Sequence, residues 1–170
     1  MASIRLAQTG DAAALAAFAA RTFRETFEAD NTAEDMALYL AANFGSERQS
    51  AEIRDAGIVT LLAEDGRRLA GYSQLFGGPA PDCVSSTAPL EIRRFYVDRN
   101  WQGRGVAQTL MMATLEAAME RGARTTWLAV WERNLRAQAF YRKCGFEDCG
   151  AKEFVLGHDR QTDRVMVRTV

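Results

Sequence analysis

Hydrophobic residues follow two different spacings along the chain. Short apolar runs, or apolar residues at every second position, are typical of β-strands. They occur in seven segments: 3–7, 58–63, 69–76, 90–97, 125–131, 152–157 and 164–169. Asp65-Gly66 between the second and third segments predicts a hairpin turn.

Apolar positions three or four residues apart predict helices between these strands. Thr9 or Asp11 can cap a first helix that runs to about Phe23, and capping-box patterns at 32–35 and 46–49 begin two more. Further helices are expected over 106–121 and 134–143. Glycines at 57, 122 and 145 would end three of the five helices.

This order of elements predicts an α+β fold of the α/β-sandwich type, with a β-α-β unit over residues 91–131 and a right-handed crossover. The 170 residues contain no repeat or linker, so we expect one domain over 1–170. No apolar run approaches the roughly 20 residues of a membrane span, and the N-terminus lacks a signal peptide pattern. We therefore expect a cytoplasmic protein without membrane contact.

The net charge of −1 conceals an uneven distribution. Residues 1–90 carry seven basic and twelve acidic side chains, whereas residues 91–145 carry ten basic and five acidic ones. The isoelectric point of about 5.9 argues against a nucleic-acid partner. The basic middle segment also contains the most informative motif.

The residues suited to metal binding or nucleophilic catalysis are few. The three cysteines lack zinc-ligand spacing, so we expect neither a metal site nor a disulfide framework. His158, the single histidine, lies in a polar turn and is expected at the surface.

The stretch Gln102-Gly-Arg-Gly-Val-Ala107 follows a predicted strand and opens a predicted helix. Glycines allow a tight turn that directs backbone N–H groups into one concavity, and a helix N-terminus attracts anions. The stretch suits a pyrophosphate, although Gly-x-Gly alone fits a plain strand-to-helix turn equally well. It matches neither a Walker loop nor a dinucleotide-binding fingerprint.

A second motif, Asn134-Leu-Arg-Ala-Gln-Ala-Phe-Tyr-Arg-Lys-Cys-Gly-Phe146, follows one strand later. Together the two motifs resemble those of the GNAT superfamily of N-acetyltransferases, most closely over residues 91–146. The segments 21–27 and 31–36 are similar to a bacterial branch that includes spermine/spermidine N-acetyltransferases. The resemblance implies a mixed, centrally splayed β-sheet flanked by helices, with acetyl-coenzyme A (acetyl-CoA) as co-substrate and no metal.

The resemblance also implies roles for individual residues. Tyr141 would be the general acid beside the thiol, although a tyrosine on an apolar helix stripe can simply be core. Glu91 would be the general base, acting through water, or an ordinary solvated strand residue. Asn134 would contact the pantetheine or a water molecule while also capping its helix. The implied cofactor-binding residues are Tyr96, Val97, Gln102, Gly103, Arg104, Gly105, Val106, Ala107, Asn134, Phe140, Tyr141 and Lys143.

The implied reaction is direct attack of a primary amine on the thioester in a ternary complex. We expect a small-molecule acceptor, with polyamines as the first candidates. Its apolar walls would be Phe23, Phe27, Tyr39 and Tyr72, or these residues are simply core. The acidic residues between Arg24 and Arg48 would attract a cationic amine or form a solvated face. The alternative functions are a peptide or protein N-terminal acetyltransferase and a non-catalytic CoA-binding sensor. A homodimer is a possible oligomeric state.

Overall fold

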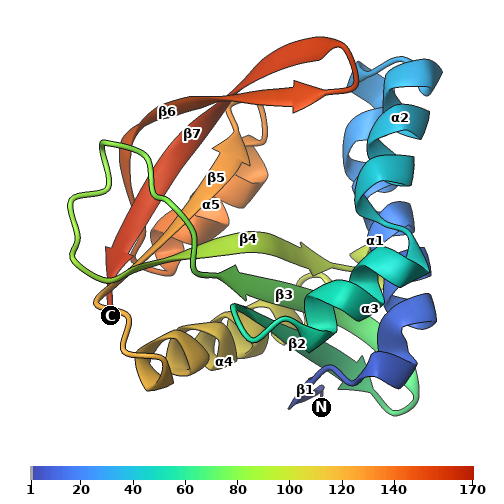
Figure 1. Ribbon diagram of the computed structural model, residues 1–170, viewed down its shortest axis with the longest axis horizontal. Helices are drawn as coiled ribbons and strands as arrows, with labels where there is room; N and C mark the ends of the chain where they lie inside the picture. Colours follow the sequence, from blue (N-terminus) through green and yellow to red (C-terminus); the bar gives the residue numbers. More distant parts are fainter. Residues whose placement is uncertain (1) are drawn as a thin grey trace.

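The computed structural model describes residues 2–170 and contains one mixed sheet of seven strands in the order β1-β2-β3-β4-β5-β7-β6 (Figure 1). The strands are β1 (Ser3–Leu6), β2 (Ile58–Asp65), β3 (Arg68–Phe76), β4 (Pro89–Val97), β5 (Thr125–Trp131), β6 (Glu147–Leu156) and β7 (Asp159–Thr169). Within residues 2–170, only β4 and β5 pair in parallel. The expected α+β architecture is confirmed.

Five helices cover the two faces of the sheet: α1 (Ala12–Phe27), α2 (Ala33–Asn43), α3 (Ser46–Arg54), α4 (Val106–Glu120) and α5 (Leu135–Lys143). Apolar residues of α4 and α5 pack on one face with strand residues such as Ile92 and Leu128. Residues of α1 and α2 pack on the other face around Tyr72 and Leu62. The sheet therefore separates two apolar layers.

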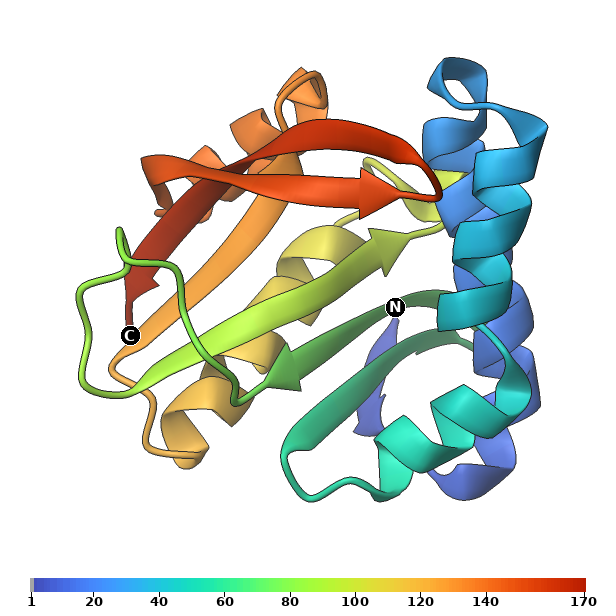
Figure 2. The ribbon, with the colours of Figure 1, turned by 45° about the horizontal axis from the view of Figure 1, so that its top comes forward.

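The sheet splits at its centre, between β4 and β5 (Figures 1 and 2). Their pairing covers only Pro89–Glu91 against Thr125–Trp127. A bulge places Arg93 outside the β3–β4 register, because Leu75 pairs with Ile92 and Gln74 with Arg94. Beyond Glu91 the two strands diverge, and the edge of β4 has no β5 partner. The expected central splay is confirmed.

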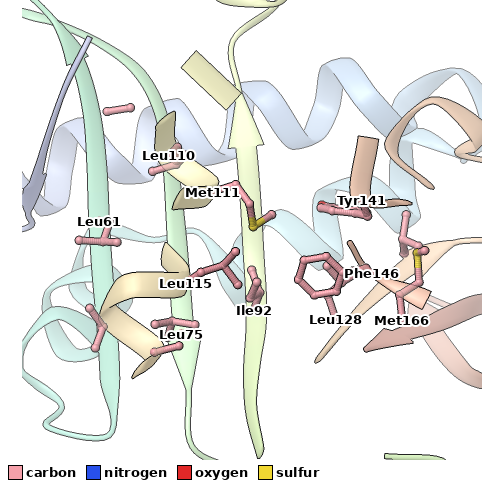
Figure 3. Packing of buried hydrophobic residues seen from close by; sticks show 14 of the residues in the cluster. Leu61, Leu75, Ile92, Leu110, Met111, Leu115, Leu128, Tyr141, Phe146 and Met166 are labelled. Atoms are coloured by element: carbon pink, nitrogen blue, oxygen red, sulfur yellow. The ribbon is translucent and has the colours of Figure 1, made fainter. Parts of the chain in front are cut away.

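The largest apolar cluster lies between the sheet and the helices α4 and α5 (Figure 3). Tyr141 of α5 packs there against Phe146, with ring centroids 6.0 Å apart. Met111 and Leu115 of α4 contact the same cluster from the other side of the splay. This cluster holds both helices that flank the opening.

The β6–β7 hairpin reaches across the opening to the start of α2 (Figure 1). The backbone N–H of His158, at the hairpin turn, donates to Asp35 Oδ1 at 2.6 Å. Gln161 Nε2 donates to Asn31 Oδ1 at 2.7 Å. A side chain at Gly157 would overlap Asp35. The hairpin therefore bridges the two halves of the split sheet at one end.

The structure differs from the sequence expectations in a few elements. Helix α1 continues four residues past Phe23 to Phe27. Gly45 occupies the N-cap of α3 without a side-chain bond, so the expected capping box at Ser46 is wrong, whereas Thr32 caps α2 as expected. The two closing strands are longer than predicted and form one hairpin.

Candidate active site

A cleft of about 870 Å³ occupies the split between β4 and β5. The predicted site residues that line it are Phe23, Phe27, Glu91, Tyr96, Val97, Gln102, Gly103, Ala107, Asn134, Phe140 and Tyr141. Arg104 and Gly105 belong to the same loop but do not line the cleft, Val106 is buried in the core at the start of α4, and Lys143 is exposed at the end of α5. The fold thus gathers both sequence motifs around one cavity.

The open edge of β4 forms one wall of the cleft. Tyr96 and Val97 pair with Tyr72 and Gly71 of β3 on one side only. Their other side faces the gap left by β5, so an extended ligand can lie there as an added strand. Gln102 Nε2 donates to the Val97 carbonyl at 3.2 Å and so ties the following loop to the end of this strand.

The loop at the start of α4 presents a group of backbone donors. Within residues 2–170, the N–H groups of Gly103, Gly105, Val106, Ala107 and Gln108 donate to no protein acceptor. Gly103 and Gly105 have φ of +75° and +83°, a conformation that other residues adopt only with strain. Such a cradle of donors at a helix N-terminus binds phosphate oxygens.

Helix α5 places two polar groups along the opposite wall. Asn134 Oδ1 accepts from the Ala137 N–H at 3.1 Å, so this residue caps the helix and its amide nitrogen remains available. Tyr141 lines the cleft although it is only 8% exposed. Burial raises the pKa of the Tyr141 hydroxyl, which therefore keeps its proton at neutral pH.

Glu91 lies where the split begins, one residue before Ile92 and the Arg93 bulge. Burial raises the pKa of its carboxyl, an effect only partly offset by the charges of Arg93 and Lys152. Arg93 Nε is 3.9 Å from Glu91 Oε2, and its guanidinium lies 3.5 Å above the centroid of the Phe76 ring. A carboxylate with a raised pKa suits proton abstraction near neutral pH.

One expectation about the acceptor end, Tyr72 as a wall, needs correction, and the structure favours the solvated-face alternative for the acidic stretch. Tyr72 is fully buried beneath Tyr96, with the rings stacked 5.7 Å apart, so it supports the wall without reaching the cleft. Of the acidic residues between Arg24 and Arg48, only Glu25 lines the cleft, where it is already paired with Arg21 and Arg99. The other acidic residues of that stretch lie at the surface or, in Asp35, bind the hairpin.

Sequence reasoning missed the residues that the closing strands and β5 bring to the cleft. Trp131, Lys152, Phe154 and Asp163 line it, and the Trp131 ring lies 5.8 Å from that of Phe27. None belongs to a motif, and only the long hairpin register brings Lys152 opposite Asp163.

Comparison with known proteins agrees with this geometry. The model of the acetyltransferase (GNAT) family matches residues 16–146. The chain belongs to this family. The expectation of an N-acetyltransferase is thereby confirmed at the level of the family, and it rests on residues that include both motifs.

Similar proteins extend the match over nearly the whole chain. An uncharacterized N-acetyltransferase of Mycobacterium tuberculosis is 36% identical over 158 residues, which cover 93% of this chain and 97% of the relative. A spermine/spermidine N(1)-acetyltransferase of Bacillus subtilis is 24% identical over 87 residues, 51% of this chain and 57% of the relative. The PaiA N-acetyltransferase of Thermoplasma acidophilum, solved with coenzyme A, superposes with a TM-score of 0.80 at 18% identity over 100% of this chain and 99% of that one.

The described residues contain no helix that is long and apolar enough to cross a bilayer. Residues 2–170 also hold no cluster of three or more histidine, cysteine or acidic side chains suited to a metal ion.

Proposed function

We propose that this GNAT enzyme transfers the acetyl group of acetyl-CoA to a primary amine of a small molecule. The observation that carries the proposal is the position of the cleft. It joins a cradle of backbone donors at one end to a half-buried carboxylate, Glu91, and a buried hydroxyl, Tyr141, further in. An anion site, an open strand edge and a proton acceptor in one cavity are the parts that this transfer needs.

The residues present fit the coenzyme. The free N–H groups of this loop would hold the pyrophosphate, with the Arg104 side chain beside them adding a positive charge. The open edge of β4 at Tyr96 and Val97 would bind the amides of the pantetheine arm. When bound, the thioester supplies the activated acetyl group.

The proton transfers then fall to two side chains. An ammonium group cannot attack, so Glu91 would accept its proton, directly or through one water molecule. The raised pKa of Glu91 brings its basicity closer to the working pH. Tyr141 would donate a hydrogen bond from its hydroxyl to the sulfur atom as the C–S bond breaks. The Val97 N–H would stabilise charge on the carbonyl oxygen.

The contacts between the β6–β7 hairpin and the start of α2 favour a small substrate over a peptide. The contacts of His158 with Asp35 and of Gln161 with Asn31 join the hairpin to α2 across the opening. A peptide chain needs a groove that is open at both ends, whereas a small amine needs only an enclosed chamber. Polyamines remain the first candidates, in line with the spermine/spermidine relative.

The decisive experiment measures thiol release from acetyl-CoA with a panel of amines, amino acids and peptides. We expect release with small primary amines and a product carrying one added acetyl group. Preferred acetylation of peptide N-termini in competition with 1,5-diaminopentane would support the peptide alternative. Coenzyme A binding without release by any acceptor would contradict the proposal and favour the sensor alternative.

A further inference from the structure

Asp163 differs from the other buried carboxylates of the described chain. Glu52 is paired with Arg94, Asp98 with Arg21, and Asp35 with the N–H of His158. Asp163 is only 7% exposed, and within residues 2–170 it makes no hydrogen bond and no ion pair shorter than 4 Å, although its oxygens are not among the fully enclosed polar atoms. It lines the cleft. A largely buried carboxylate that opens only toward a cleft is poorly solvated, so a cationic ligand in that cleft would stabilise it.

The surroundings leave this carboxylate charged at neutral pH. Burial raises the pKa of Asp163 to about 6, with Lys152 of β6 opposing the rise and Glu132 after β5 adding to it. Lys152 is opposite Asp163 in the hairpin register, but its Nζ lies 5.5 Å from the Trp127 ring centroid and forms no ion pair with Asp163. Asp163 therefore offers negative charge to whatever enters the cleft.

The sheet register places Asp163 away from Glu91. Glu91 pairs with Trp127, and Asp163 pairs with Trp131, so all four side chains project from the same face of the sheet. The four-residue offset between the two tryptophans corresponds to about 13 Å along β5. The two side chains therefore start far apart along the sheet, a spacing that suits two groups of one bound molecule better than a single amine.

We propose that Asp163 binds a second protonated amine of the acceptor while the first amine reacts near Glu91. The apolar rings of Phe27, Trp131 and Phe154 line the cleft and suit a methylene chain between the two charges. The inference rests on the proposed function and narrows it to acceptors of the diamine class. It makes Asp163 a determinant of specificity rather than of the proton transfers.

The test compares two acceptors that differ in one charge, 1,5-diaminopentane and 1-aminopentane. In Asp163→Asn, kcat/KM for the diamine should fall by about 10- to 100-fold, since a charge-assisted contact is lost. The value for 1-aminopentane should change less than about twofold. Glu147→Gln is the control, because it removes an exposed carboxylate of β6 outside the cleft. Equal losses for both acceptors, or none, would overturn the inference.

Two further measurements separate the inference from the proposed function. Calorimetry of 1,5-diaminopentane on the protein saturated with coenzyme A should show weaker binding in Asp163→Asn, whether or not turnover occurs. At pH 7.5 the melting temperature of this variant should be about 2–4 °C higher than that of the wild type. At pH 4, where the wild-type carboxyl is protonated, the two melting temperatures should be the same. A lower melting temperature at pH 7.5 would show instead that Asp163 is a structural partner of Lys152.

Discussion

Arg94 Nη1 lies 2.7 Å from Glu52 Oε2, and both side chains are only 8% exposed. The buried amide of Gln74 completes the contact, accepting from Arg94 Nη1 at 2.9 Å and donating to Glu52 Oε2 at 3.1 Å. The pair joins α3 to β4 one residue past the bulge. Because Arg94 also lines the cleft, this buried network sets the position of the wall that carries Glu91.

Replacing Glu52 by glutamine should lower the free energy of unfolding by about 3 kcal/mol at pH 7, because Arg94 would keep a buried charge without its counter-ion. Burial opposes ionisation of Glu52, but the charge of Arg94 and the hydrogen bonds of Gln74 and Arg94 outweigh it and lower the pKa of the carboxyl. This stabilisation is present above the unfolded-state pKa of about 4.3 and is lost as the pH falls through the lower folded-state pKa.

Denaturant melts at pH 7 and pH 3 measure this effect. The difference between wild type and Glu52→Gln should shrink at the lower pH. Glu47→Gln, at an exposed position in the same helix, should change stability by less than about 0.5 kcal/mol. A difference for Glu52→Gln that is the same at both pH values would rule out the ion pair as its source.

The substitution Gly105→Glu should abolish coenzyme A binding, because a carboxylate would enter the cradle of N–H donors. Gly105→Gln has nearly the same size and the same strain at positive φ, without the charge. Isothermal titration should show a loss of at least about 10-fold between the glutamine and glutamate variants, with equal melting temperatures. Equal affinities would refute the assignment of the loop to the pyrophosphate.

The substitution Tyr141→Phe should lower kcat by about 10²- to 10³-fold. The affinity for coenzyme A should stay within about threefold of the wild-type value. The ring still fills its place beside Phe95, Phe140 and Phe146, so the melting temperature should stay close to that of the wild type. Tyr141→Ala, which empties that place, should cost about 3–5 kcal/mol of stability. Unchanged turnover in Tyr141→Phe would reduce the residue to a packing role.

The pH profile of kcat/KM should report Glu91. Since burial raises its pKa above the usual 4.5, activity should fall on acidification through a midpoint above that value as the carboxylate takes up a proton. Glu91→Gln should be much slower and lack this acidic limb, while Glu91→Asp should retain it. If the limb persists in Glu91→Gln, the base is another group or solvent.

Alanine at Gly157 should open the acceptor end of the cleft, because its methyl group would displace the hairpin from Asp35. The KM for a small amine should rise about 5- to 20-fold, whereas the affinity for coenzyme A should not change. Steady-state kinetics measures the KM for the amine, and calorimetry measures the affinity for coenzyme A. A variant with wild-type KM would show that the hairpin contact does not enclose the acceptor.

The sequence sufficed for the parts of the site that local backbone geometry determines. Gly103 and Gly105 mark the donor loop because positive φ selects glycine, and Asn134 marks a helix start because its side chain caps it. It did not suffice for Asp163, whose role depends on the register of β7 against β5 and β6. Such pairings join residues far apart in the chain and leave no local pattern.

Side-chain direction was the other quantity that the sequence left open. Tyr72 and Phe27 were equally plausible as walls, but strand pairing turned Tyr72 beneath Tyr96, whereas the longer α1 carried Phe27 to the cleft. Cys83 and Cys149, 66 positions apart, bring their sulfur atoms to 3.0 Å as thiols, a contact that no spacing rule foresees.

The unpaired N–H groups from Gly105 to Gln108 also concern the folding of the empty protein. Within residues 2–170 no side chain caps α4, so water or a ligand must satisfy these donors. The coenzyme would therefore act as the missing N-terminal cap of α4, a helix that packs on β2 and β3 at the centre of the main core. Coenzyme binding is therefore linked to folding of that core. The free energy of unfolding would be highest when the co-substrate is abundant.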